Sequence, residues 1–358
     1  MKITKKLISI VLVAALCIST FACVFSVNAA DFSKYKVYTS IGDSNSSGYG
    51  STGYIDNRLP APNAIKTLVA KGLDAELRDF GTGGFRTHEI RYMLCPGYEM
   101  DWEYADRCDG DVKKSDLDAY KDDYVKAVVD ADVISIVAGA NDFFGDIFGT
   151  ALAKLFVPSE KLAEIRAKCD AESEYGAKLI ALCDSLDSVF KVMNFVSELV
   201  TLLRDAIVEF RENWDAVVGR IYELNPDVQI VVVNPINSFN NAYVSLGEAQ
   251  IDISFIFDII MGRYQNYVRF LSPYAKSYYY VDATDIKLSR IDLKDEKLLS
   301  DPDYRFALVH YHDDEQAEIA RRIIEVLETE GASQSNKVSV AATVALLWDA
   351  AELFATQF

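Results

Sequence analysis

The sequence predicts an α/β fold, a three-layer α/β/α sandwich with a parallel five-stranded sheet. Strand-like and helix-like segments alternate along the chain, which is typical of a parallel sheet covered by helices. Two of the strand-like runs are apolar at nearly every position, as in strands that are buried on both faces. In such folds ligands bind beyond the C-terminal ends of the strands, so functional residues are expected there.

Five runs are predicted as strands. The first alternates polar and apolar residues like a half-buried strand, whereas the third and fourth are almost continuously apolar. In chain order the predicted strands are 37–41, 75–80, 133–138, 229–234 and 278–283.

Segments with helical periodicity lie between and after these runs. In the last of them Ile319, Ile323, Ile324 and Leu327 follow one face, the spacing of a helix that packs on a core. The predicted helices are 63–71, 87–94, 120–129, 214–224, 254–272 and 315–328.

One stretch, from about 147 to 211, contains no strand candidate. Its apolar residues recur at helical spacing between Val189 and Leu203, so it is either a helical insertion or an unusually large set of crossover helices. A linker and a C-terminal helix are expected over 331–358. Asp349 and Glu352 within the amphipathic segment 339–356 argue against a membrane span and favour a docking helix.

The N-terminus has the pattern of a secretory signal peptide. Lysines at positions 2, 5 and 6 precede an apolar run from Leu7 to Val27, and small residues follow it at a cleavage site after Ala29 or Ala30. This pattern predicts a signal peptide over 1–29, a secreted extracellular protein and a main domain over 31–330. Two alternatives stay open, a retained membrane anchor and a lipoprotein that is modified at Cys23.

Composition limits the class of partner. Half of the residues (50%) are hydrophobic, which is enough for a substantial core, and the formal net charge is −18. Such acidity argues against nucleic acid, anionic membranes and anionic wall polymers as partners. A neutral or cationic substrate, either a small molecule or a carbohydrate, is compatible with it, and the oligomeric state is left open.

Four cysteines follow the predicted signal peptide. Their spacing fits no zinc motif. Outside the cell they would allow disulfides between sequence neighbours, Cys95–Cys108 and Cys169–Cys183, with free buried thiols as the alternative.

The tripeptide Gly42-Asp43-Ser44 ends the first predicted strand. A serine at this position, followed by a Gly- and Ser-rich segment, is where an α/β enzyme places a nucleophile. Such a serine needs a base for its proton and hydrogen-bond donors for the oxyanion that forms on the substrate.

The sequence contains only three histidines that could act as the base. His88 opens a helix and is expected at the surface or in a structural role. His310 and His312 lie just before the last helix, on the same side of a parallel sheet as Ser44. They are candidate bases, with a solvated surface pair and a His-x-His metal site as alternatives.

Two turns are candidates for the oxyanion site. In residues 79–87, after the second strand, Gly83 and Gly84 would let backbone N–H groups approach a ligand. In Gly139-Ala140-Asn141-Asp142, after the third strand, Asn141 can donate a side-chain N–H. Each turn alone is also what an ordinary turn contains, but the ordered set favours a functional site.

This ordered set resembles the SGNH subgroup of the GDSL hydrolases. Gly42-Asp43-Ser44 matches the first block of the family, with Asn45 in place of leucine, Gly84 matches the second block, and Gly139-Ala140-Asn141-Asp142 matches the third. The resemblance covers most of the chain outside the stretch 147–211 and the tail, and it implies a flavodoxin-like sandwich.

The fourth block of the family, Asp-x-x-His-Pro, fits less well. Alignment on Ile319-Ala320 makes His310 the catalytic histidine and puts Tyr311 at the proline and Ala307 at the acid. Choosing His312 requires a two-residue deletion and puts Val309 at the acid. An acid could come from Asp301 or Asp303, or a backbone carbonyl could hold the imidazole.

The resemblance implies a serine esterase in which Ser44 is the nucleophile and His310 is the base. The N–H groups of Ser44 and Gly84 and the side chain of Asn141 would bind the oxyanion, with no metal or organic cofactor. The implied substrates are carboxylic esters, such as acylated carbohydrates, short acyl esters or lipids. Nearby aromatic residues are candidates for a pocket or for the core: Tyr49, Phe85, Phe143 and Phe144.

Two alternatives come from other classes of protein. The missing acid suggests a catalytically weak or inactive binding protein on the same scaffold. A metal-dependent hydrolase would use His310 and His312 together with Asp313 or Asp282.

Overall fold

The computed structural model describes residues 32–57, 59–100, 113–144, 159–168, 174–246 and 249–329. The chain divides into two units, Met1–Lys34 and Tyr35–Phe358. In the first unit the described residues form a 3₁₀ turn, Phe32–Lys34. The predicted signal peptide (1–29) and the predicted C-terminal helix (331–358) lie outside the described residues.

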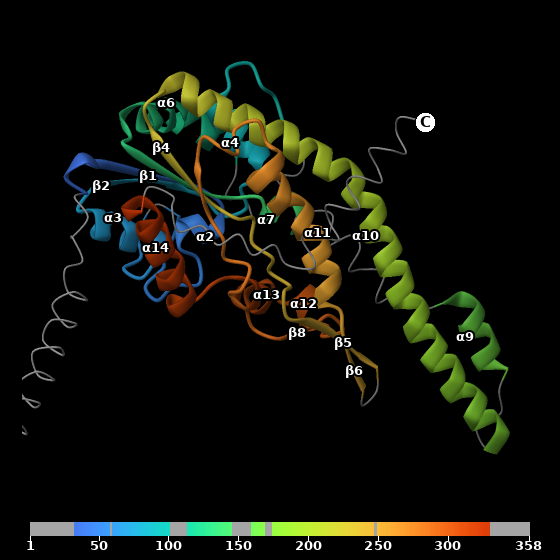
Figure 1. The fold of residues 1–358 in the computed structure, drawn as a ribbon. Helices are drawn as coiled ribbons and strands as arrows, with labels where there is room; N and C mark the ends of the chain where they lie inside the picture. The colour runs from blue at the N-terminus through green and yellow to red at the C-terminus, as the bar shows by residue number, and fades with distance from the viewer. Residues whose placement is uncertain are drawn as a thin grey trace, which may run out of the picture. The chain divides into compact units, whose positions relative to one another are not determined.

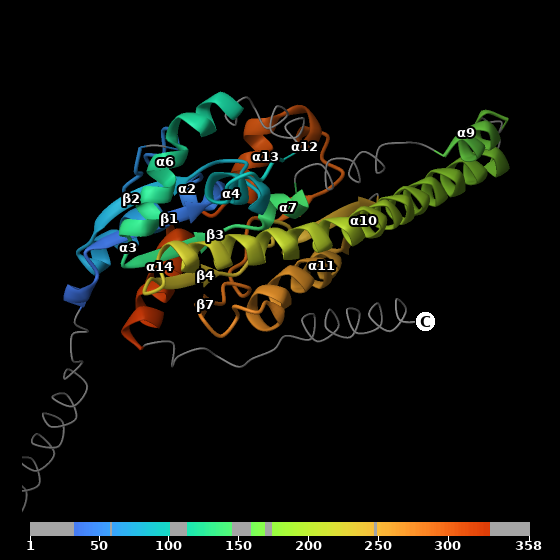
Figure 2. The same ribbon diagram turned by 90° about the horizontal axis from the view of Figure 1, so that it is seen from above.

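The second unit contains a five-stranded parallel sheet with the strand order β2-β1-β3-β4-β7 (Figure 1; all five strands are labelled in Figure 2). All five predicted strands are present, and the predicted α/β sandwich is confirmed. The strands are β1 (Val37–Gly42), β2 (Glu76–Gly81), β3 (Val133–Val137), β4 (Gln229–Val233) and β7 (Tyr279–Val281).

Burial of the central strands follows the sequence with one exception. β3 and β4 are buried along almost their whole length, as their continuous apolarity predicts. β1 was predicted to be half-buried but is buried on both faces. Its polar side chains have partners inside the protein, because Thr39 Oγ1 donates to the Ala127 carbonyl (2.9 Å) and Ser40 Oγ bonds to Ser46 Oγ (2.9 Å).

Helices cover both faces of the sheet (Figures 1 and 2). On one face α3 (Ile65–Leu73) packs against α14 (Asp313–Glu328), whose side chains Ile319, Ile323 and Leu327 are buried as predicted. The other face carries α4 (Thr87–Leu94), α6 (Lys114–Asp130) and the C-terminal part of α10 (Glu174–Leu224).

The stretch without predicted strands is dominated by one long helix. α10 runs unbroken from Glu174 to Leu224, so the predicted helix 214–224 is its last part and serves as the crossover into β4. α9 (Glu160–Ala167) packs beside it. The described residues between 147 and 211 contain no strand. Residues 147–158 and 169–173, and the side chains of Val196, Leu199 and Leu203, lie outside the described part.

Several short elements were not predicted. A second sheet, with the order β6-β5-β8, consists of three strands of two to five residues. The predicted helix 254–272 is an α-helix followed by a π-helical turn, η2 (Tyr267–Leu271). The α-helical part is α11 (Ser254–Asn266). The elements that were not predicted are α2 (Ser44–Ser47), α7 (Ala140–Phe144), β5 (Ala242–Leu246), β6 (Ala249–Asp252), β8 (Ile291–Asp292), α12 (Lys297–Ser300) and α13 (Pro302–Val309).

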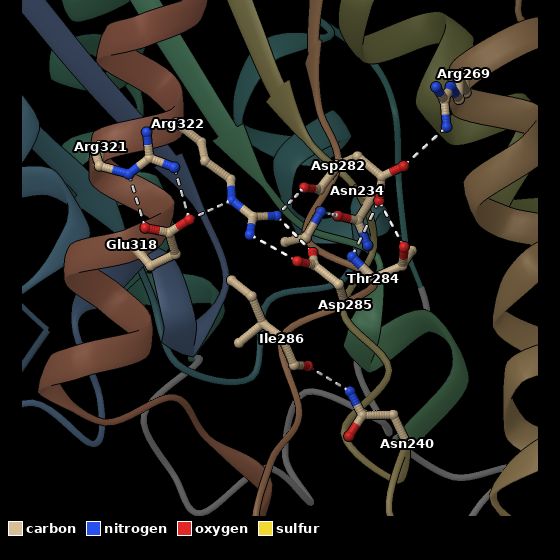
Figure 3. Close-up of polar contacts among 11 residues, drawn as sticks. Asn234, Asn240, Arg269, Asp282, Thr284, Asp285, Ile286, Glu318, Arg321 and Arg322 are labelled. Carbon is tan, nitrogen blue, oxygen red and sulfur yellow. Dashed lines mark hydrogen bonds and ion pairs between the residues drawn. The ribbon is translucent and has the colours of Figure 1, made fainter. Parts of the chain in front are cut away.

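A network of charged side chains ties α14 to the turn after β7 (Figure 3). Arg322 of α14 pairs with Asp285 (2.6 Å between Nη1 and Oδ1) and donates to the Asp282 carbonyl (2.5 Å). Glu318 accepts hydrogen bonds from Arg321 and Arg322, which lower the pKa of Glu318 to about 2. The last strand of the sheet is therefore bound to the helix that follows His310 and His312.

The structure also bears on the expected state of the cysteines and on the expectation of no membrane span. Cys95 and Cys183 carry free thiols, and Cys108 and Cys169 lie outside the described residues. Among the helices that the structure describes, none combines the length and the apolarity needed to cross a membrane.

We expect the substitution Gly42→Ala to be strongly destabilising. Gly42 has a φ of +141°, and an added Cβ would lie 1.9 Å from the Val137 carbonyl oxygen. Backbone strain then adds to a clash with the neighbouring strand, so the free energy of unfolding should fall by about 3 kcal/mol or more in denaturant titrations.

The matched control for this prediction is Gly97→Ala. Gly97 has a φ of +78°, and beyond its two chain neighbours no atom of the described residues lies within 4 Å of an added Cβ. Only backbone strain remains there, so the expected loss is about 1 kcal/mol. Equal losses in the two variants would contradict the proposed clash at Gly42.

Candidate active site

The chain turns sharply at the end of β1 and places Ser44 at the first position of α2. The Asp43 N–H donates to the Val137 carbonyl (2.9 Å). The Asp43 carboxylate accepts from the Asn45 N–H (2.9 Å) and so caps the short helix. Ser44 is 8% exposed and lies at the C-terminal edge of the sheet, where the sequence predicted a nucleophile.

Ser44 contacts His310, which lies 266 positions further along the chain. Ser44 Oγ and His310 Nε2 are 2.7 Å apart. His310 is the residue at which α13 ends, and it is 8% exposed. The Tyr49 ring lies over the imidazole, with ring centroids 4.5 Å apart. A buried serine hydroxyl in hydrogen-bond contact with an imidazole is the arrangement of a nucleophile and its base.

His312 makes different contacts. Its Nδ1 faces the Gly50 carbonyl oxygen (3.2 Å), and its backbone N–H donates to Glu315 at the start of α14. The side chain is exposed. Of the two candidate bases, His310 is therefore the one in hydrogen-bond contact with Ser44. The third histidine, His88, is half-buried beside Tyr98, with 3.1 Å between Nδ1 and the hydroxyl.

The residues suggested for a metal site have separate partners. Asp313 accepts from the Thr52 N–H (2.7 Å) and from Asn63 Nδ2 (2.9 Å), and Asp282 pairs with Arg269 (2.9 Å). In the described part of the chain, no group of three or more His, Cys, Asp and Glu side chains is arranged to hold a metal ion.

The candidates for an orienting acid are placed as follows. Ala307 lies on α13 and has no carboxylate. The Asp301 side chain accepts from the Tyr304 N–H (3.0 Å) and caps α13. The Asp303 side chain lies outside the described residues. Tyr311, which follows His310, is buried, and burial raises the pKa of its hydroxyl.

The turn after β2 brings Gly84 to the same edge of the sheet. Thr82 donates its N–H to the Gly42 carbonyl (3.0 Å), so the two strands end side by side. The Phe85 N–H then closes the turn on the Thr82 carbonyl (3.2 Å), and Gly84 within it has a φ of +79°.

The turn after β3 is bonded to the turn after β2. Asn141, in α7, donates from Nδ2 to the Phe85 carbonyl (3.0 Å). The neighbouring Asp142 carboxylate accepts from the Thr87 N–H (2.9 Å) and from the Thr87 hydroxyl. A primary amide has two N–H donors, and the Phe85 carbonyl uses one of those on Asn141.

Two buried carboxyl groups lie at this edge of the sheet, Asp43 after β1 and Asp142 after β3. Burial raises the pKa of Asp43 to about 7, although hydrogen bonds from Asn45 favour its charged form. Burial likewise raises the pKa of Asp142 to about 6, against the effect of the bonds from Thr87. Both groups therefore titrate closer to neutral pH than an ordinary aspartate.

The aromatic candidates divide between core and site. Phe85 and Phe143 are fully buried in the core, whereas Tyr49 contacts His310. The Phe144 side chain lies outside the described residues. The sequence reasoning missed Gln316, a fully buried polar residue on the apolar face of α14. Its position one turn before Ile319 and Ala320 was the signal that could have identified it.

Comparison with known proteins gives similarity at the level of structure. No protein-family model matches the chain, and no curated protein matches it in sequence. The solved structures that resemble the chain include lipases and carbohydrate esterases.

Three of these neighbours illustrate the range. The extracellular lipase of Streptomyces rimosus has a TM-score of 0.44 and 13% identity, covering 81% of this chain and 98% of that one. The phospholipase A1 of Streptomyces albidoflavus NA297 has a TM-score of 0.41 and 14% identity, covering 82% and 99%. A carbohydrate esterase family 2 enzyme from Corynascus thermopiles has a TM-score of 0.37 and 13% identity, covering 82% and 67%.

The raised pKa of Asp43 predicts how Asp43→Asn changes stability with pH. The folded state holds the proton up to about pH 7, whereas an unfolded aspartate releases it near 4. The stability that wild type gains from the Asp43 carboxyl is fully present below the pKa of the unfolded aspartate, and it is lost as pH rises through about 7. The variant stays neutral and should gain stability relative to wild type over that window, by at most about 1.4 kcal/mol per pH unit.

Denaturant titrations of both proteins across this pH window measure the effect. Asp285→Asn serves as a control of opposite sign, because hydrogen bonding to Arg322 lowers the pKa of Asp285. The Asp285→Asn variant should be less stable than wild type, and this difference in the free energy of unfolding should shrink as pH falls through the acid range. A difference between Asp43→Asn and wild type that is independent of pH would contradict the prediction.

Proposed function

We propose that this protein is a secreted serine esterase of the SGNH type that hydrolyses carboxylic esters. The observation that carries the proposal is the 2.7 Å contact between Ser44 Oγ and His310 Nε2. Both side chains are buried at the edge of the sheet where the turns that contain Gly84 and Asn141 also lie. Secretion is proposed from the signal-peptide pattern over 1–29.

In the first half of the reaction, Ser44 Oγ attacks the ester carbonyl while His310 Nε2 takes the hydroxyl proton. The tetrahedral intermediate collapses to an acyl-enzyme, and the imidazolium returns the proton to the departing alcohol. In the second half, His310 removes a proton from water, which attacks the acyl group. The carboxylic acid leaves, and the proton on His310 returns to Ser44.

The oxyanion of each tetrahedral intermediate needs fixed donors. We assign this role to the backbone N–H groups of Ser44 and Gly84 and to the Asn141 side chain. The Asp43 carboxylate bonds to the N–H of Asn45, one residue beyond Ser44. Gly84 has a positive φ and no side chain, which leaves its N–H open to a ligand. The Phe85 carbonyl accepts a hydrogen bond from the Asn141 amide and holds it in place. This mechanism uses no metal ion or organic cofactor.

The charge of the protein supports neutral esters as substrates. With a formal net charge of −18, the chain would repel anionic polymers and surfaces. Acylated carbohydrates, short acyl esters and neutral lipids meet this condition. Ala307, at the position of the family's acid, favours a second candidate, a binding protein on the same scaffold with little or no activity.

Substitutions of Ser44 and of the two histidines test the mechanism. Hydrolysis of p-nitrophenyl acetate should lose about 10³-fold or more in kcat in Ser44→Ala and His310→Ala, while His312→Ala stays within about threefold of wild type. A fluorophosphonate probe should label wild type and His312→Ala but not Ser44→Ala.

The outcomes separate the candidates. Wild type that neither hydrolyses esters nor reacts with the probe would support the binding protein and overturn the esterase. Activity that survives Ser44→Ala would exclude Ser44 as the nucleophile. Loss of activity in His312→Ala but not in His310→Ala would transfer the role of base to His312.

A further inference from the structure

Gln316 is a buried polar side chain that the mechanism above does not use. It lies in the first turns of α14 and is 0% exposed. A buried amide costs free energy unless its polar atoms find partners, so the contacts of Gln316 show what holds it there.

The Gln316 amide joins three separate segments of the chain. Nε2 donates to the carbonyl of Tyr311 (2.8 Å) and to the carbonyl of Tyr49 (3.0 Å). Oε1 accepts from the N–H of Ile65 (3.1 Å). Each of the two N–H donors thus has an acceptor, and the oxygen has a donor.

Two of these segments carry the Ser–His pair. Tyr311 directly follows His310. Tyr49 follows the short helix that begins at Ser44, its N–H donates to the Ser44 carbonyl (2.9 Å), and its ring lies over the His310 imidazole. The Gln316 amide therefore bonds to the main chain on both sides of the contact between Ser44 and His310.

The third contact attaches this bridge to a rigid element. Ile65 is the first residue of α3, and the preceding residue, Ala64, has no side chain that can cap the helix. The Gln316 oxygen satisfies one of the N–H groups that a helix leaves unpaired at its start. Because α3 and α14 pack together on the sheet, the amide is held from two helices.

We propose that Gln316 is a positioning residue that sets the distance and orientation between Ser44 and His310. This inference rests on the proposed esterase function. Ser44 and His310 come from distant parts of the chain, so their contact depends on bonds between the segments that hold them. Replacing the amide by an apolar group removes this donor from the buried Tyr311 carbonyl and from the part-buried Tyr49 carbonyl, and it frees both segments to shift.

The first test compares Gln316→Leu with wild type. We expect kcat for p-nitrophenyl acetate to fall roughly tenfold or more, because a small misplacement of reacting groups is costly, with KM within about twofold. Asn225→Leu is the matched control. Asn225 Nδ2 also donates to backbone carbonyls, those of Val128, Val129 and Ala131, but it lies just before β4, at the opposite edge of the sheet from Ser44.

Both leucine variants should lose thermal stability, and only Gln316→Leu should lose kcat when both are assayed well below their melting temperatures. A kcat in Gln316→Leu equal to that of Asn225→Leu would overturn the proposal.

Gln316→Glu supplies a second readout. A glutamate has the same shape, but its ionised carboxylate has no donor for the two carbonyls, whereas the protonated form regains one. The ratio of its kcat to that of wild type should therefore fall as pH rises, while the ratio for Gln316→Leu stays constant. A constant ratio in both variants would contradict a role for the donated hydrogen bonds.

A measurement without substrate separates failure of this proposal from failure of the proposed function. The chain has three histidines, so the ¹⁵N signals of His310 can be assigned with His310→Ala as reference. Ser44→Ala should move the Nε2 signal of His310 in the wild-type background, and much less in the Gln316→Leu background. Equal shifts in both backgrounds would overturn the positioning role, whether or not wild type hydrolyses esters.

Discussion

The site depends on three parallel strands that end at the same level. β1 lies between β2 and β3, and Gly42, its last residue, is in register with both Gly81 and Val137. Each of the three strands ends at this level, and hydrogen bonds connect the turns that follow them. Ser44, Gly84 and Asn141 are far apart in sequence but share one edge because parallel pairing aligns the carboxyl ends of strands.

A second constraint acts from the other end of the chain. Between β7 and His310 the chain passes through β8, one strand of the small sheet, and two short helices. Its return is held by α14, through Arg322 on the turn after β7 and through Gln316 and Asp313 on the segment after Ser44. Hydrogen bonds and ion pairs distributed along α14 thus hold the loop that carries His310.

Local pattern explains which features the sequence could predict. β3 and β4 are almost continuously apolar and β1 alternates, so periodicity identified these three strands, and β2 and β7 were identified as well. The strands of the second sheet, of two to five residues, were not predicted. The polar residues of β1 suggested a wet face, but Thr39 and Ser40 bond to groups inside the protein, which periodicity cannot detect. The long helix α10 was predicted in two separate parts, the helical spacing between Val189 and Leu203 and the helix 214–224, which periodicity alone did not join.

The sequence by itself determined the parallel sandwich, the placement of Ser44 after the first strand and the two turns with Gly84 and Asn141. These depend on residue types within a few positions of one another. Only the tertiary structure decided that His310 and not His312 lies on Ser44, that Asp301 caps a helix, and that Gln316 joins three segments. Those outcomes depend on how distant segments pack. The alignment favoured His310 but left His312 open, and in the fold His310, at the end of α13, contacts Ser44, whereas His312 caps α14.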